Sequence, residues 1–289
     1  LAVLGSVLGG PGAFSGFIEA ENAALKTLKI GRDLQGGSAA TAGGATPTNS
    51  GYVTAHGLGA VTIGGSIEAG AGNTPAGTHP NNGSIHSSLH LGTLTVQGSV
   101  SGNIEQSENR VSISARSQHA PGTIARSDLT IGRIVIGGTL QHADIVAGVF
   151  GDLQPANPDA QIGAVAVGGD WIASHLRAGI ADGGDGFGNG NDAKIGNTGQ
   201  PDFRDNDDAT GAISRIASVI IKGSAIGTFN PNDAAVFAIE AQHLVSIKVG
   251  GAREPLQAGR SNDLFSLSDP LGATRRNGGT ADFYAFEVA

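Results

Sequence analysis

The sequence has no cysteine, no methionine and one tryptophan, and aromatic residues make up only 4% of it. The lack of cysteine excludes disulfides and thiolate chemistry, so stability has to come from packing, backbone hydrogen bonds or bound ions. The apolar set is dominated by alanine, valine, isoleucine and leucine, and such small side chains suit a narrow, regular interior. Glycine is abundant, with 48 of 289 residues, which indicates many turns.

Basic residues are also scarce, with 17 lysines and arginines against 25 acidic residues and a net charge of −8. A nucleic-acid binder needs a basic surface to displace phosphate counterions, so we expect no nucleic-acid partner. Long apolar runs are missing as well. The uncharged segment 1–18 is interrupted by glycine and proline and lacks a basic start. We therefore expect it to belong to the folded repeat, and we expect no membrane insertion.

What the chain does contain is an internal repeat, visible in two segments of equal length, IGRIVIGGTLQHADIVAG (131–148) and IGAVAVGGDWIASHLRAG (162–179). Aligned on the opening motif, seven copies occur, and we expect an eighth, degenerate copy in residues 1–21. The seven copies begin at Leu25, Leu58, Leu91, Ile131, Ile162, Ile216 and Leu244. Such self-similarity predicts stacked structural repeats.

Within each copy, apolar residues alternate with small or polar ones. The positions three and five residues after the start always hold valine, isoleucine or leucine, as Leu28 and Ile30 do in the first copy. This period of two predicts β-strands. The starting residue has the opposite parity, so we expect a bend after it, where glycine would tolerate unusual backbone angles. Glycine follows the start in four copies, at Gly59, Gly92, Gly132 and Gly163.

A second glycine lies seven residues after the start in six copies, and an apolar residue usually follows it. Each copy therefore predicts several short strands separated by glycine corners. One copy cannot bury its apolar face alone, whereas stacked copies can pair in parallel with their equivalents. The predicted fold is all-β, a parallel β-helix of about eight coils with long Gly/Asn/Asp-rich loop insertions. A β-propeller or β-sandwich is the rival, and would need antiparallel hairpins.

The insertion at residues 182–211 is the most acidic, with seven aspartates against one lysine and one arginine. Oxygen ligands on a flexible, glycine-rich chain are what Ca²⁺ prefers, so the loop is a candidate calcium site, with a solvated acidic loop as the alternative. It matches no EF-hand, and GNGNDAKI (188–195) is similar to only one copy of a calcium-binding nonapeptide. The candidate ligands are Asp182, Asp185, Asn189, Asn191, Asp192, Asp205, Asp207 and Asp208.

No common catalytic motif is present: the chain has no HExxH, no P-loop and no GxSxG. The eight histidines share no position of the repeat, and we expect them on the surface or in loops. Trp171 falls at an inward position and is expected to fill the core. Four glutamates fall near equivalent turns without a partner carboxylate in register, which disfavours a polysaccharide-cleaving enzyme: Glu19, Glu68, Glu105 and Glu240. A carbohydrate-active or carbohydrate-binding β-helix remains the alternative function.

The pattern IGxVxIGG, followed by an apolar residue, xIxAG and the insert ADGGDGFGNGNDA, resembles the repeats of very large exported bacterial surface proteins of the planctomycete type. It is similar, more loosely, to autotransporter and adhesin β-helices. The resemblance covers residues 25–256 and implies an extracellular or cell-surface location and a surface-layer, filament or adhesin role. It supplies no catalytic residues.

Residues 1–256 are therefore predicted to form the β-helix, and residues 257–289 a C-terminal segment outside the repeat. Its end alternates Phe283, Tyr284, Phe286 and Val288, which predicts a closing strand. This strand either caps the open coil of its own chain or is donated to a neighbouring subunit. The sequence as a whole predicts a non-enzymatic structural protein that self-associates into a filament or lattice, with calcium and a carbohydrate as candidate ligands.

Overall fold

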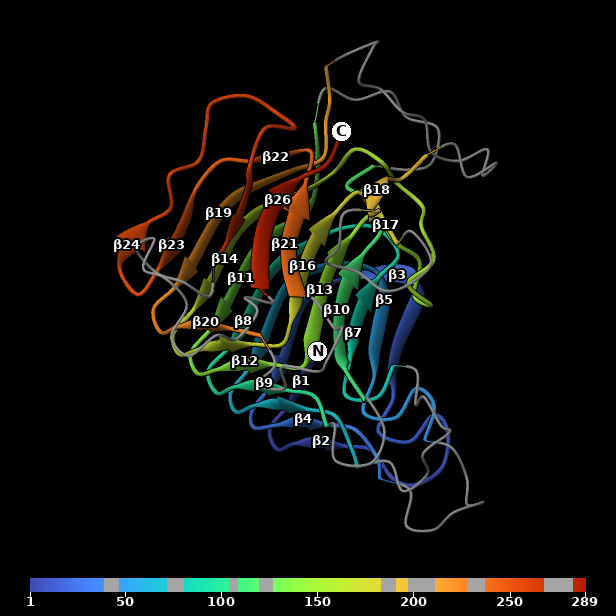
Figure 1. The fold of residues 1–289 in the computed structure, drawn as a ribbon. Coiled ribbons are helices and arrows are strands. Elements are labelled where there is room, and N and C mark those ends of the chain that lie inside the picture. The colour runs from blue at the N-terminus through green and yellow to red at the C-terminus, as the bar shows by residue number, and fades with distance from the viewer. Residues whose placement is uncertain are drawn as a thin grey trace.

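A computed structural model describes residues 1–38, 47–71, 81–103, 109–119, 127–182, 191–196, 211–227, 237–267 and 283–289 of the chain. All regular elements in these ranges are β-strands, which form three ladders (Figure 1). Within the same ranges, no helix is long and apolar enough to cross a bilayer.

The first ladder contains the opening strand of each repeat. Its members are β1 (Ala2–Val3), β3 (Ile18–Ile30), β5 (Val53–Ile63), β8 (Leu91–Val96), β11 (Asp128–Ile136), β14 (Ala160–Val167), β19 (Arg215–Ile221), β22 (His243–Leu244) and β23 (Ile247–Val249). Each strand pairs in parallel with its equivalent in the next copy, and the seven predicted starting residues are direct partners. The alignment of the repeat is therefore confirmed residue by residue.

The inward positions of this ladder form the core. Residues three and five positions after each start are at most 2% exposed in all seven copies. Burial of each such side chain contributes roughly 1.5–3 kcal/mol before conformational entropy is subtracted. β1 also pairs with β3, so the first residues of the sequence belong to the same ladder, as expected.

The glycines after the starting residues have a different role from the predicted one. None of the four has a positive φ, and β5 and β11 run through their glycine without interruption. A Cβ placed on Gly92 would instead lie 2.5 Å from the carbonyl oxygen of Gly59 in the preceding copy. The predicted bend is present, because the alternate residues that face the core change from one set to the other after the starting residue. Glycine is needed there because the backbones of stacked copies approach closely.

The second ladder consists of two-residue strands that follow the second glycine corner. They are β2 (Val7–Leu8), β4 (Leu34–Gln35), β6 (Ile67–Glu68), β9 (Val100–Ser101), β12 (Leu140–Gln141), β15 (Trp171–Ile172) and β20 (Ala225–Ile226). All pairings are parallel, and the apolar residue after each corner points into the core. Trp171 is completely buried, and its Nε1–H donates to the Ser174 carbonyl at 2.9 Å, which confirms its predicted core position.

The third ladder begins with the N-terminal halves of β3 and β5, which join it to the first ladder in one sheet. It continues through β7 (Ile85–Ser87), β10 (Val111–Ala115), β13 (Ala143–Ala147), β16 (His175–Ala178), β21 (Phe237–Ala241) and β26 (Phe283–Glu287). These strands lie side by side in Figure 1, with the second ladder along the lower edge.

One outward position recurs in every strand of the third ladder, and the residues at this position are named the outer row. The register makes its members consecutive neighbours: Glu19, Thr54, His86, Ser114, Val146, Arg177, Glu240 and Phe286. Glu19 is exposed and Thr54 half-buried, whereas every member from His86 onward is buried. The outer row therefore has an open end and a covered end.

Three pairs of short strands are antiparallel: β17 (Ile180–Ala181) with β18 (Ala193–Lys194), β24 (Ala252–Arg253) with β23, and β25 (Leu264–Ser266) with β26. All other ladders in the described ranges are parallel, so the fold is all-β and mostly parallel, and the hairpins of a propeller or sandwich do not dominate it. The predicted C-terminal segment contributes β25 and β26, and β26 pairs in parallel with β21 of its own chain.

Candidate functional site

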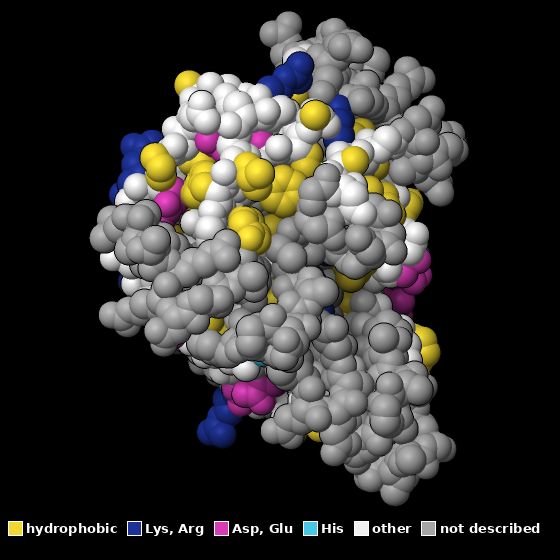
Figure 2. Space-filling view, viewed as in Figure 1, with side chains coloured by type: hydrophobic (Ala, Val, Ile, Leu, Met, Phe, Trp, Pro, Cys, Tyr) yellow, Lys and Arg dark blue, Asp and Glu magenta, His cyan; other side chains and the backbone are white. Residues whose placement is uncertain are grey.

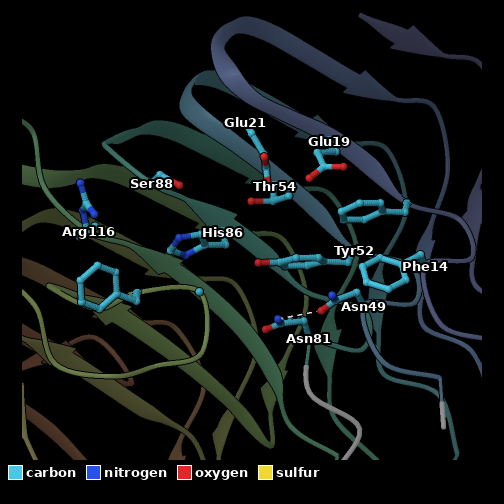
Figure 3. Close-up of a pocket in the computed structure, with 13 residues that line it drawn as sticks. Phe14, Glu19, Glu21, Asn49, Tyr52, Thr54, Asn81, His86, Ser88 and Arg116 are labelled. Carbon is cyan, nitrogen blue, oxygen red and sulfur yellow. Dashed lines mark hydrogen bonds between the residues drawn. The ribbon is translucent and has the colours of Figure 1, made fainter.

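A groove of about 320 Å³ lies over the open end of the outer row (Figure 3). Its residues come from five neighbouring strands of the third ladder and the turns beside them, so it crosses the strands and follows the stacking direction. The lining residues are Phe14, Phe17, Glu19, Glu21, Asn49, Tyr52, Thr54, Asn81, His86, Ser88, Arg116, Phe150 and Gly151.

Aromatic rings form one wall of the groove. Phe17 stacks on Tyr52 with ring centroids 5.7 Å apart and planes 13° apart, and the edge of Phe14 meets Phe17 at 5.5 Å. Phe14 is 61% exposed although it is a large apolar side chain. At the other end, the Arg116 guanidinium lies 5.2 Å from the centre of the Phe150 ring. The groove therefore offers apolar ring surface at both ends.

Two carboxylates line the rim above Tyr52 in Figure 3. Glu19 and Glu21 stand two residues apart on β3, where the pairing with β5 is irregular between Ala20 and Ala24, and their side chains are in hydrogen-bond contact. The hydrogen bond that Glu21 makes with Glu19, together with partial desolvation and the repulsion between the two charges, raises the pKa of Glu19. In Figure 2, acidic side chains gather at the edge of the molecule where β3 lies in Figure 1.

The floor of the groove carries neutral polar groups. The His86 Nδ1 lies 2.9 Å from the Ser114 Oγ, and burial together with the nearby Arg116 charge lowers the pKa of His86 to about 4. Burial raises the pKa of Tyr52 to about 12, although a hydrogen bond with Thr54 opposes the shift. At neutral pH the imidazole and the phenol are therefore both uncharged, and each can donate or accept hydrogen bonds.

Two similar turns position the lower wall. Asn49 and Asn81 both have positive φ, which asparagine tolerates better than most residues, and the side-chain nitrogen of Asn81 donates to the Asn49 oxygen at 2.9 Å. A glycine with positive φ follows two residues later in each turn, at Gly51 and Gly83. The Asn-x-Gly spacing thus repeats the same turn in successive copies and leads the chain into Tyr52 and into β7.

The covered end of the outer row contains a second polar cluster, the buried charged cluster, made of Arg110, Asp144, His175, Arg177 and Glu240. Asp144 and His175 are direct register partners, as are Arg177 and Glu240. The Arg110 Nε donates to the Asp144 Oδ2 at 2.9 Å, and its Nη2 donates to the carbonyl oxygens of Ala143 and Ala173. Arg177 is 2% exposed and Glu240 is fully buried.

The pKa shifts in the buried charged cluster follow from burial and mutual attraction. Burial alone would raise the pKa of Asp144, but the Arg110 and Arg177 guanidinium groups lower it to about 2. Burial lowers the pKa of His175 to about 3, against the opposing charge of Asp144. Burial also lowers the pKa of Arg177, while Asp144 and Glu240 oppose that shift. The charges compensate one another, and His175 is neutral at pH 7.

Three of the eight predicted calcium ligands lie in the described ranges. Asp182 and Asn191 are exposed, whereas Asp192 is 7% exposed and interacts electrostatically with Arg177. No group of three or more histidine, aspartate or glutamate side chains is placed to hold a metal within those ranges. The other five candidates lie outside the described residues: Asp185, Asn189, Asp205, Asp207 and Asp208. Calcium binding by this loop stays a prediction.

One expectation from the sequence was wrong. Histidines were expected on the surface or in loops, but His86 and His175 lie on β7 and β16 and are at most 8% exposed, whereas His142 does lie in the bend between β12 and β13. The register partner of Glu19 is Thr54, so no carboxylate faces it from the neighbouring strand, but Glu21 on the same strand forms a carboxylate pair with it. The Glu-x-Glu spacing could have revealed this pair. The contribution of Phe14, Tyr52 and Arg116 could not be seen, because they lie outside the repeated strand positions.

Comparison with known proteins adds no further guidance: no family model, no curated protein and no solved structure matches this chain.

Proposed function

We propose that this protein is a non-enzymatic structural protein of the cell surface, built as a parallel β-helix of about eight coils and acting as a surface-layer, filament or adhesin scaffold. The observation that carries the proposal is the parallel register of the three ladders, in which equivalent residues of successive copies are neighbours. Each coil would contribute one strand to each ladder. At about 4.8 Å per coil, eight coils make a rod on the order of 40 Å long.

Self-association into a filament or lattice is supported by the first coil. Among the described residues, β1 pairs only with β3 and β2 only with β4, so each has one open edge. Leu1, Leu4 and Leu8 beside these strands are 62%, 93% and 59% exposed. An open strand edge flanked by exposed apolar residues is a template for pairing with another chain.

The C-terminal strand supports capping over donation to a neighbour. Phe283 and Ala285 of β26 are fully buried, and the Phe283 ring meets Trp171 edge-on at 6.3 Å. Removal of residues 280–289 would uncover this part of the core. We expect the truncated chain to aggregate or unfold. A truncated chain that keeps its fold and loses only assembly would instead indicate strand donation.

Negative-stain electron microscopy of the purified chain tests the scaffold proposal directly. We expect fibres or a lattice at high protein concentration, and isolated rods after Leu4→Lys and Leu8→Lys substitutions at the open edge. A matched Leu264→Lys variant, at a leucine that is 74% exposed on β25, should assemble normally. Monodisperse rods of the unaltered chain at all concentrations would contradict self-association.

A carbohydrate-active enzyme is the second candidate, and the groove favours it. Glycosidases place two carboxyl groups about 5–5.5 Å or about 6.5–9.5 Å apart, on either side of the bond that breaks. Glu19 and Glu21 are in mutual hydrogen-bond contact on one strand, which suits binding better than such a reaction. Activity screens on pectin, alginate and neutral glucans test this candidate, and turnover abolished by Glu21→Gln would support it over the scaffold role.

A further inference from the structure

We propose that the groove over the open end of the outer row binds a neutral oligosaccharide, which stacks on Phe14 and Tyr52 and hydrogen-bonds to the carboxylate rim and the polar floor. This inference goes beyond the scaffold role and rests on the groove alone, because assembly and ligand binding use different residues. The proposed ligand is an uncharged glycan chain.

The shape of the groove fits a chain ligand. Its residues come from five neighbouring strands or their adjoining turns, from β3 to β13, and strands about 4.8 Å apart give a length of about 19 Å. Such a length suits several linked sugar rings better than a single one. Aromatic surface at both ends, from Phe14 and Phe150, can pack on the apolar faces of rings near the two ends of the chain.

The polar lining matches a ligand rich in hydroxyl groups. The Tyr52 and Thr54 hydroxyls, the Ser88 hydroxyl, and the Asn49 and Asn81 amides all face the groove as uncharged groups that donate and accept hydrogen bonds (Figure 3). The carboxylates of the rim add acceptors. A few polar groups placed around an apolar wall are typical of sites that fix the orientation of a small ligand.

A peptide strand is disfavoured by the construction of the floor. Extended peptides bind by adding a strand to a free sheet edge, where main-chain hydrogen bonds supply the affinity. Here β5, β7 and β10 each pair with a strand on both sides, so their main-chain groups already have partners. Apart from Gly151, the groove is lined by residues with side chains, and these are the groups that a glycan would contact.

The charge of the groove selects against anionic ligands. Glu19 and Glu21 stand against one cation, Arg116, and the exposed Asp152 lies close enough to influence the floor. A polyuronate or nucleic acid would bring its negative charges against the carboxylate rim.

Isothermal titration calorimetry of the full chain tests the proposal with three probes: cellohexaose, the hexamer of N-acetylglucosamine, and hexagalacturonate. We expect heat from at least one neutral hexamer and none from hexagalacturonate. Phe14→Ala should weaken binding about tenfold through lost stacking. Leu264→Ala is the matched control, because Leu264 is a similarly exposed apolar residue (74%) outside the groove and outside the open edge, and it should bind normally.

A Glu19→Gln/Glu21→Gln double variant tests the charge argument and alters only exposed side chains. It should keep a measurable affinity for the neutral hexamer and gain affinity for hexagalacturonate. Absence of heat with both neutral hexamers at millimolar concentration overturns the proposal, as does binding that is insensitive to both groove variants. Preferential binding of hexagalacturonate to the unaltered chain would also overturn it. Failure of assembly in electron microscopy contradicts the scaffold role without affecting this result.

Discussion

The two ends of the outer row differ in what covers them, although they share one strand geometry. Glu19 and Glu240 occupy the same row, yet Glu19 is exposed at the rim of a groove and Glu240 is fully buried beside Arg177. At the covered end, Ile180 packs with Ala238 and Phe286 on the outside of the sheet as a small second core. The repeat determines that these side chains point outward, whereas the segments around it determine whether they meet water.

The comparison also separates two uses of charge. At the open end, carboxylates remain hydrated and available to a ligand. At the covered end, desolvation makes every charge costly unless an opposite charge lies beside it. The buried charged cluster meets this requirement with two arginines against Asp144 and Glu240, and with a neutral His175. Substitutions at equivalent positions should therefore have very different effects.

Arg177→Met should give the largest loss of stability. It removes a cation that compensates Asp144 and Glu240 and leaves their charges desolvated, which should lower the free energy of unfolding by about 3–5 kcal/mol. Urea denaturation measures the change. Arg133→Met, at an exposed arginine of β11, is the matched control and should stay within about 0.5 kcal/mol. Equal losses in both variants would mean that the covered end gains nothing from this charge.

Acid should destabilise the covered end through His175. Its folded pKa of about 3 lies below the ordinary 6.5, so the unfolded chain binds the proton first and stability falls as pH drops from about 6.5 toward 3. Between pH 7 and pH 4 the loss should reach roughly 2–3 kcal/mol. Asp144, with a folded pKa of about 2, adds a loss below pH 4.

Thermal melting as a function of pH measures this dependence. His175→Gln should flatten the curve between pH 6.5 and pH 4, while His56→Gln, at an exposed histidine of β5, should leave it unchanged. An unaltered slope in His175→Gln would contradict the assignment.

The pair Glu240→Gln and Glu19→Gln tests the same substitution at both ends of the outer row. Glu240→Gln removes a charge that compensates the buried Arg177 and should cost about 1–3 kcal/mol. Glu19→Gln removes a charge from the exposed rim and should cause no measurable loss. Chemical denaturation of the two variants measures the loss in the free energy of unfolding, and similar losses would show that the two ends are equally covered.

Calcium should have the smallest effect, confined to the loop beside the covered end. A weak site of the extracellular kind, with a dissociation constant near 10⁻⁴–10⁻³ M, should add about 1 kcal/mol at millimolar Ca²⁺ and raise the melting temperature by about 1–3 °C. EDTA should reverse the shift, an Asp205→Asn/Asp207→Asn variant should lack it, and Mg²⁺ at equal ionic strength serves as the control. An unchanged melting curve in calcium would leave the loop as a solvated acidic insertion.

The strand positions could be predicted in detail because the same pattern of inward and outward residues occurs in seven copies. Leu28, Val61 and Leu94 are interchangeable apolar residues at one slot, and only an inward strand position tolerates that set and nothing polar. The groove was less accessible to prediction. Phe14, Tyr52 and Arg116 lie outside the repeated strand positions, and nothing in their local pattern indicates that they converge.

By itself, the sequence determined the strands, their inward faces and the parallel register. The reason is that alternation along a strand and repetition between copies are local properties, which do not depend on how the copies stack. The tertiary structure alone decided which outward residues are covered, because coverage depends on where loops of unequal length return. It also revealed that Gly92 is needed for close approach to Gly59 of the preceding copy, a contact between residues 33 positions apart. The same reason separates Glu19 from Glu240: their place on the strand is encoded locally, but their environment is supplied by distant parts of the chain.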